Sequence, residues 1–293
     1  MDFAMNFQLL ATGLAMGSIY ALVALGFVLI FNAVSVVNFA QGEFVMVPAF
    51  VAVTLMTALN VPFPLAYQLT LVFTVLFGLV FQRVAYYPLR NRSFLPVIIS
   101  TIGVSIFLKN GAQVVFGAEP LLMARPTSPN PINLGGVFID PQHVVILIVT
   151  LVLVGFQYFF FEKTSLGKKM QATAQDKEMA RLLGIRVMRM IAFTFIYSSL
   201  LGAAAGIMVG PIFYVTKEMG GMLGLKAFCA TIVGGFGNVP GSILGGLFVG
   251  VIEVFAAYYI SSAYRDAVAF VVLVLVLLFW PQGLFGEKIA EKA

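Results

Sequence analysis

Long apolar runs, separated by short polar or glycine-rich segments, make up most of this chain. Eight runs are long enough to form membrane-spanning helices, and a shorter apolar run, 223–235, precedes a glycine-rich break. The runs are continuous rather than alternating, which favours spanning helices over the strands of a membrane barrel. The predicted spans are 7–31, 44–59, 65–82, 95–116, 143–161, 190–213, 241–260 and 266–281.

Composition supports the same class. The chain has 293 residues, of which 61% are hydrophobic and 10% charged, whereas soluble domains carry about a quarter charged residues. Because a lipid-exposed backbone must satisfy its own hydrogen bonds, helices are required. We therefore expect an all-α polytopic membrane protein, organised as a single domain over 1–293 and surrounded by membrane lipid.

Basic residues predict the orientation of the chain. Twelve of the 17 Lys and Arg residues lie in loop 83–94, loop 162–189 and the C-terminal tail. Positively charged loops stay in the cytoplasm, so we expect a cytoplasmic C-terminus and an N-terminus outside. The basic residues do not form the patch that nucleic acid requires, so no nucleic-acid partner is predicted.

The longest outside segment, 117–142, contains five prolines and cannot continue a helix. It is either a simple connector or a docking surface for a partner outside the membrane.

The stretch KAFCATIVGGFGNVPGSILGG, 226–246, raises the question of a phosphate-binding loop. It lacks the Lys and Ser or Thr of a P-loop, and Pro240 stands where a dinucleotide fingerprint needs glycine. The stretch instead predicts a break between helices. Gly234, Gly235 and Gly237 end one helix, Asn238 caps the next, and Pro240 lies in its first turn. A half-helix with a break inside the membrane and a plain turn both remain open.

Small residues recur at a spacing of four and predict close helix packing, either within the bundle or between subunits. The glycines with this spacing are Gly13 and Gly17, then Gly202, Gly206 and Gly210, then Gly241, Gly245, Gly246 and Gly250. The segments 13–26 and 237–250 also resemble each other weakly and are predicted to cross in opposite directions, which hints at an inverted repeat.

Polar residues interrupt the apolar pattern at few places. Asn38, Gln41 and Glu43 either face a translocation path or form a cytoplasmic turn, with Glu43 at a helix start. Glu253 is the one acid well inside a predicted span, and its function stays open. No catalytic or metal-binding constellation is visible, so we expect a non-catalytic chain with no cofactor of its own.

The basic segment 162–190 contains a short alanine-bearing helix that ends at Gly184. It is either a solvated topogenic loop or a helix that transmits a push from another protein.

Four stretches carry a resemblance that covers both ends and the middle of the chain: GSIYALVALGFVLIFNAVSVVNFAQGEF, MQATAQDKEMARLLGI, GLKAFCATIVGGFGNVPGSILGGL and PQGLFG. They resemble the permease subunits of ABC importers for branched-chain amino acids. Gln41 departs from the pattern, because many members have His there, and this leaves the cargo open.

The resemblance implies a homologous second permease, two cytoplasmic ATPase subunits that bind ATP and Mg, and a periplasmic substrate-binding protein. It also implies a coupling role for segment 162–190. The residues to which that role would fall are Ala172, Ala174, Asp176, Ala180 and Gly184.

Two functions follow as hypotheses. The first is a permease subunit that forms half of the path for branched-chain or related small amino acids. The alternative is an ion-coupled secondary transporter, or a channel, for a small neutral solute such as urea or an amide, in which Glu253 would carry the coupling.

Overall fold

A computed structural model describes residues 2–128, 130–134 and 136–286 of the chain. These residues form a helical bundle with one small hairpin. The α-helices are α1 (Asp2–Val34), α2 (Glu43–Thr57), α3 (Phe63–Phe81), α4 (Phe94–Phe116), α5 (Pro141–Lys163), α6 (Ser165–Gln175), α7 (Lys177–Leu182), α8 (Val187–Phe213), α9 (Met219–Gly234), α10 (Val239–Tyr259) and α11 (Arg265–Phe279). Single turns η1 (Gln82–Tyr86), η2 (Tyr87–Leu89) and η3 (Ser262–Tyr264) and strands β1 (Ile132–Leu134) and β2 (Val137–Ile139) complete the described elements.

Seven helical segments are long and apolar enough to cross a membrane. Every predicted span other than 44–59 corresponds to one of these segments. The prediction was wrong in one respect, because 44–59 is the short helix α2. With 15 residues in α2 and 16 in α9, both reach only about 22–24 Å, less than the ~30 Å of a hydrocarbon core.

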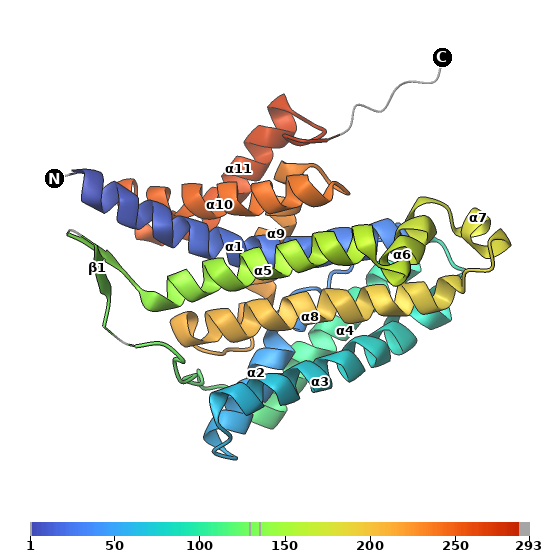
Figure 1. The fold of residues 1–293 in the computed structure, drawn as a ribbon, viewed down its shortest axis with the longest axis horizontal. Coiled ribbons are helices and arrows are strands. Elements are labelled where there is room, and N and C mark those ends of the chain that lie inside the picture. Colours follow the sequence, from blue (N-terminus) through green and yellow to red (C-terminus); the bar gives the residue numbers. More distant parts are fainter. Residues whose placement is uncertain (1, 129, 135, 287–293) are drawn as a thin grey trace.

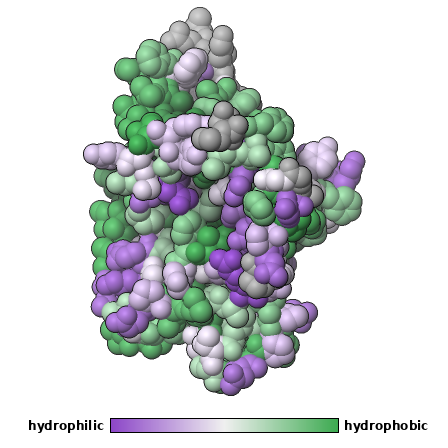
Figure 2. Space-filling model, turned by 90° about the vertical axis from the view of Figure 1, so that its left-hand side faces the viewer, coloured by the Kyte–Doolittle hydropathy of each residue, from purple (hydrophilic) through white to green (hydrophobic). Residues whose placement is uncertain are grey.

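The long helices run side by side along the longest axis of the molecule, and polar connections lie at both ends (Figure 1). Helices α6 and α7 form one end, which we call the loop end. The β1–β2 hairpin lies at the other end, the hairpin end. Figure 2 looks onto the hairpin end, where hydrophilic side chains gather across the face and hydrophobic ones lie along parts of its margin. This distribution is expected for a bundle whose sides face lipid.

Helix α1 forms the centre of the bundle. Its most apolar 18-residue window is 89% buried, compared with 11% in α4 and 17% in α5 and α11. Helices α8, α9 and α10 pack around α1. The helices on the outside are apolar on their exposed faces because lipid, rather than water, surrounds them.

The glycines at a spacing of four let these helices approach closely within one chain. A Cβ on Gly17 would lie 2.6 Å from the Leu247 Cα, and one on Gly246 would lie 2.6 Å from the Ala21 Cα. Helices α1 and α10 therefore meet backbone to backbone. Both pairs therefore lie at contacts inside the bundle of one chain.

The same principle holds for the other predicted packing glycines. Gly13 contacts Val251 of α10, Gly202 and Gly206 contact the α2 backbone, Gly210 contacts Met123, Gly241 contacts Gly234, and Gly245 contacts Ala230.

The two weakly similar segments lie against each other. Residue 13 meets residue 251, residue 17 meets residue 247, and residue 21 meets residue 246. The order of these contacts shows that α1 and α10 run antiparallel, as the inverted-repeat interpretation requires.

Replacing Gly17 by leucine is expected to prevent native packing of α1 against α10. The added side chain meets backbone atoms that cannot rotate away, so the cost should exceed the about 3 kcal/mol typical of overpacked cores. Thermal melting of the purified protein in detergent measures the loss. Gly103→Leu is the matched control, because a Cβ on Gly103 in α4 has no neighbour within 4 Å. Equal melting temperatures for the two variants would contradict this account of the glycines.

The proline-containing segment 117–142 is ordered over its described residues and lies at the hairpin end (Figure 1). Strands β1 and β2 pair antiparallel, and Leu121 forms a bridge with Val215. Arg125 donates a hydrogen bond to the Pro211 carbonyl and pairs with Asp140 at 3.1 Å. The proline-rich stretch thus lies against the C-terminal end of α8.

Candidate functional site

The glycine-rich break joins α9 to α10 at the loop end. Gly235 and Gly237 have φ values of 106° and 93°, a region that favours glycine. The Asn238 side chain accepts a hydrogen bond of 2.8 Å from the Gly241 backbone N–H, and Pro240 lies in the first turn of α10. The chain therefore forms a capped break between two helices at these residues.

Two distant segments hold this break in place. Asn32 of α1 donates a 3.0 Å hydrogen bond to the Gly237 carbonyl. The backbone N–H groups of Leu284 and Phe285 donate to the carbonyls of Val233 and Gly234. The PQGLFG motif is thus bound to the end of α9.

The polar residues between α1 and the start of α2 are buried, whereas a simple surface turn would leave them exposed. Asn38 is 2% exposed, Gln41 0% and Glu43 2%. Glu43 begins α2 and accepts a 2.9 Å hydrogen bond from the Ser105 hydroxyl. The expected helix start at Glu43 is confirmed, but the carboxylate points into the protein rather than to solvent.

This cluster is only partly satisfied. The Ser198 hydroxyl donates to Gln41 at 3.0 Å, in space left by Gly26. Within the described residues, Asn38 Nδ2, Gln41 Nε2 and Glu43 Oε2 have no hydrogen-bond partner. Buried polar atoms are normally paired. Their gathering at one place therefore marks a polar site inside the bundle.

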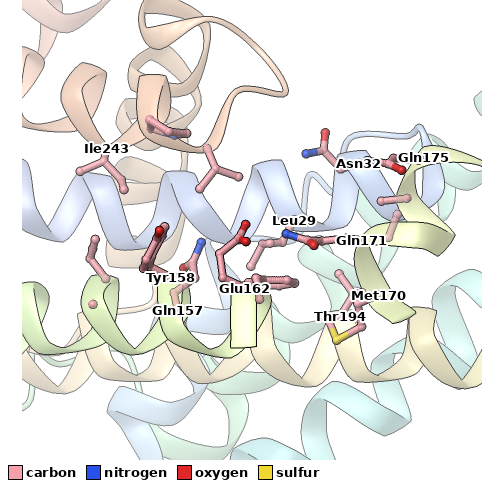
Figure 3. A pocket seen from close by; sticks show the side chains of 17 residues that line it. Leu29, Asn32, Gln157, Tyr158, Glu162, Met170, Gln171, Gln175, Thr194 and Ile243 are labelled. Atoms are coloured by element: carbon pink, nitrogen blue, oxygen red, sulfur yellow. The ribbon is translucent and has the colours of Figure 1, made fainter. Parts of the chain in front are cut away.

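A cavity of about 870 Å³ lies between α5 and α6 on one side and α1, α8 and α10 on the other. Figure 3 shows Gln157, Tyr158 and Glu162 projecting into it from α5, and Gln171 and Gln175 entering from α6. Most of its wall is apolar. Val239 and Pro240 also line it, so the cavity places α6 opposite the first turn of α10.

The predicted coupling residues occupy different environments at the loop end. Asp176 ends α6 and caps α7, accepting hydrogen bonds from the Glu178 and Met179 N–H groups at 2.8 and 3.0 Å. Gly184 ends the α7 region with a φ of 77°. Ala174 lines the large cavity, and Ala172 is half-buried.

Ala180 is 1% exposed and anchors α7 to the bundle. Its buried side chain is not on the surface that a docking partner would contact.

The exposed surface of α7 and the residue after it carries three apolar side chains beside the charged Glu178 and Arg181. Met179 is 59% exposed, Leu182 81% and Leu183 76%. They lie in a polar, basic segment, and partial burial lowers the pKa of the neighbouring Lys177, with Arg181 adding to this effect. Apolar side chains on a surface that water can reach often mark a protein contact.

Glu253 belongs to an ion-pair cluster that the sequence did not predict. It is fully buried and accepts hydrogen bonds from Lys226 at 2.8 Å, Arg265 at 2.7 Å and the Tyr20 hydroxyl at 2.8 Å. Lys226 also pairs with Asp266 at 2.5 Å. The cluster joins α1, α9, α10 and α11.

Spacing along the chain could not reveal this cluster, since Tyr20 and Glu253 are 233 positions apart. The available signal was a lysine and a glutamate that each lie alone in an apolar run. Two isolated opposite charges in neighbouring helices predict pairing.

The fold, with its long apolar helices and buried polar sites, defines a polytopic α-helical membrane protein. Residues 9–277 match the family described as branched-chain amino acid transport system permease components. The chain belongs to this family.

Full-length relatives agree with this assignment. The high-affinity branched-chain amino acid transport system permease protein BraD of Pseudomonas aeruginosa is 37% identical over 298 residues, covering 97% of both chains. The corresponding LivH protein of Escherichia coli K12 is 34% identical over 300 residues, again covering 97% of both. Homologues with these names are transport permeases, and this chain is a multi-pass permease of the same kind.

A solved structure, PsaBC from Streptococcus pneumoniae in complex with Fab, has a similar fold. The TM-score is 0.50 at 13% sequence identity, covering 92% of this chain and 91% of that one. At this identity the likeness concerns the arrangement of helices alone.

Proposed function

We propose that this chain is the permease subunit of an ABC importer and forms half of the path for branched-chain or related small amino acids. The family match over residues 9–277 carries this proposal. Relatives named for branched-chain amino acid transport support the choice of cargo. The chain itself is non-catalytic and binds no cofactor, because ATP and Mg are bound by partner subunits.

The proposed complex contains a homologous second permease, two ATPases and a periplasmic binding protein. In this assembly the loop end faces the cytoplasm and the hairpin end faces outward, with the N-terminus outside and the C-terminus inside. The clustering of Lys and Arg in loops 83–94 and 162–189 supports this orientation. The structured hairpin end is then the surface that receives the binding protein.

Helices α6 and α7 are the proposed contact with an ATPase. Leu182 and Leu183 offer exposed apolar side chains for a groove. A push on α6 would reach α10 through α1, because α6 packs on α1 and α1 packs on α10 beside the large cavity. Compressing or widening this space is a physical route from ATP binding to movement of the glycine-rich break.

The charge cluster argues against ion-coupled transport as the alternative function. A coupling carboxylate must gain and lose its ion during the cycle. Glu253 instead has two cationic partners and a hydroxyl donor. This pairing favours a structural carboxylate that holds helices together.

Transport by reconstituted proteoliposomes tests the proposal. We expect leucine uptake only when the permease pair, the ATPases, a binding protein and internal ATP are all present. A vanadate-treated sample serves as the control, because it blocks ATP hydrolysis while leaving any ion gradient intact. Uptake by this chain alone under a proton or sodium gradient would overturn the proposal in favour of a secondary transporter.

A further inference from the structure

A second cavity, of about 340 Å³, lies at the hairpin end, next to the buried Glu253 cluster. It opens where α8 ends and where α9 and α11 begin. The length of α8, about 40 Å for its 27 residues, separates this second cavity from the α6–α7 loop. This volume is at the lower end of the range for small-molecule sites.

One wall of this cavity carries charges of both signs. Arg265 uses Nε to hold Glu253 at 2.7 Å, and its guanidinium carbon lies 5.4 Å from the centre of the Phe213 ring. Within the described residues, its two terminal nitrogens make no hydrogen bond. A guanidinium fixed at Nε in this way can offer its terminal N–H groups to a carboxylate.

Asp266 supplies the opposite charge beside Arg265. One carboxylate oxygen pairs with Lys226 at 2.5 Å, and the side chain is 53% exposed. The second oxygen has no hydrogen-bond partner within the described residues. It is available to accept from an ammonium group. The Thr216 and Ser262 hydroxyls line the same cavity.

Tyr20, Glu218 and Lys226 also line the cavity. The rest of the wall is apolar and suits an unbranched or branched aliphatic chain. Its members are Met16, Val209, Phe213, Met219, Met222 and Leu223. Methionine side chains adapt their shape to what they contact, so this wall can accept several aliphatic chains of similar size.

We propose that this cavity is a transient binding subsite for a free zwitterionic amino acid with an aliphatic side chain. Arg265 binds the carboxylate, Asp266 binds the ammonium group, and the methionine-rich wall contacts the side chain. The proposal rests on the function proposed above, since it places the cargo at the outward end of this subunit. A site with one sign of charge would suit a simple anion or cation. The two signs side by side match a zwitterion.

The buried cluster explains why the subsite would hold its shape without cargo. Glu253 fixes the guanidinium through Nε, and Lys226 fixes one oxygen of Asp266. Both recognition groups are therefore positioned by other side chains of this chain before cargo arrives, and little ordering is left to occur on binding.

Direct binding tests the subsite without the binding protein. The permease pair and its ATPases are purified in lipid nanodiscs, and saturable binding of radiolabelled L-leucine is measured up to millimolar concentrations. Leucinamide and 4-methylpentanoate, which lack the carboxylate and the ammonium group respectively, are compared as competitors. We expect each to compete at least about 10-fold more weakly than leucine, because each loses a charge-assisted hydrogen bond.

Variants assign each charge to its partner. Arg265→Gln should weaken leucine binding about 10- to 100-fold, and Arg265→Lys should be intermediate because it cannot bind bidentately. Asp266→Asn should weaken leucine binding while leaving that of 4-methylpentanoate unchanged. A residue that only maintained structure would affect both ligands alike. Arg125→Gln, which removes another arginine of the hairpin end, is the control and should bind leucine as the wild type does.

The outcomes separate the subsite from the proposed function. The subsite would be overturned if Arg265→Gln and Asp266→Asn both bound leucine as the wild type does. It would also be overturned if Asp266→Asn weakened the binding of leucine and of 4-methylpentanoate equally. A wild-type complex that imports leucine with its binding protein, yet shows no saturable binding alone, would also overturn the subsite while the proposed function stands. Saturable, Arg265-dependent binding without ATP-dependent uptake would support the subsite and contradict the proposed function.

Discussion

Replacing Leu182 and Leu183 together by glutamate is expected to reduce ATP-dependent uptake by about 10- to 100-fold while the permease stays folded. These side chains are 81% and 76% exposed, so the folded chain alone loses little when they become charged. In an interface with an ATPase, however, the same change would bury two unpaired carboxylates. Central apolar anchors contribute about 2 kcal/mol or more each to such contacts.

The measurement combines three readouts from one preparation. Uptake of leucine into proteoliposomes should fall, co-purification of the ATPases should weaken, and the melting temperature of the permease should stay unchanged. Leu182→Met with Leu183→Met is the conservative control, because it keeps both side chains apolar and should keep most of the uptake. Asn91→Glu controls for added charge, since Asn91 is exposed in the neighbouring loop 83–94.

Ala180 makes a useful contrast within the same helix. It is 1% exposed, so Ala180→Glu should lower the melting temperature as well as uptake. Uptake at the wild-type rate in the double glutamate variant would contradict a docking role for α7 and leave segment 162–190 as a topogenic loop.

Local signals predicted a large part of this structure. The break after α9 was predicted because glycines with positive φ, an asparagine cap and a proline in the first turn each act within a few residues. The long helices were predicted because about 20 apolar residues suffice to define a span. None of these features depends on which helices are neighbours.

The structure differs from the sequence-based predictions where tertiary packing determines the local conformation. Helix α2 ends at Thr57, and Asn60 follows with a φ of 51°, so a run that is apolar enough for a longer span stops early. The β1–β2 hairpin lies in a segment whose prolines excluded a helix without indicating strands. Burial of Ala180 depends on how α7 folds back onto the bundle, which helical spacing alone does not determine.

The polar sites illustrate the same limit. Asn38, Gln41 and Glu43 were recognisable as polar interruptions, but their burial depends on contacts with Ser105 and Ser198 from distant helices. For Glu253, the sequence showed an isolated acid and left open whether it had a partner. Its function as an ion-coupling group looked plausible only while Lys226 and Arg265 could not be placed beside it.

Removing the charge of Glu253 is therefore expected to destabilise the protein rather than to abolish a coupling ion site. Glu253→Met leaves Lys226, whose side chain is 8% exposed, with Asp266 as its one acidic partner among the residues that the structure describes. Removing one member of a buried ion pair costs about 3–5 kcal/mol. Lys226→Met should cost less, because Glu253 retains Arg265 and Tyr20.

A double-mutant cycle measures the coupling between the two residues. If their interaction is structural, the double variant Lys226→Met with Glu253→Met should be more stable than the sum of the single losses predicts, by about 1–3 kcal/mol. Two methionines can fill the space of the pair without leaving a buried charge, and such replacements are often tolerated. Unfolding of each variant in mixed micelles gives the four free energies.

Transport by the same variants distinguishes the two functional hypotheses. With a structural ion pair, the stabilised double variant should recover part of its ATP-dependent uptake, although neither charge is present. Recovery stays incomplete because Arg265 and Asp266 lose the partners that position them. An ion-coupled transporter requires the carboxylate itself, so every variant without Glu253 would lose uptake however stable it is. Because the double variant separates folding from charge, recovered uptake would show that the membrane-embedded acid of this permease holds helices together, and that the energy for transport enters elsewhere.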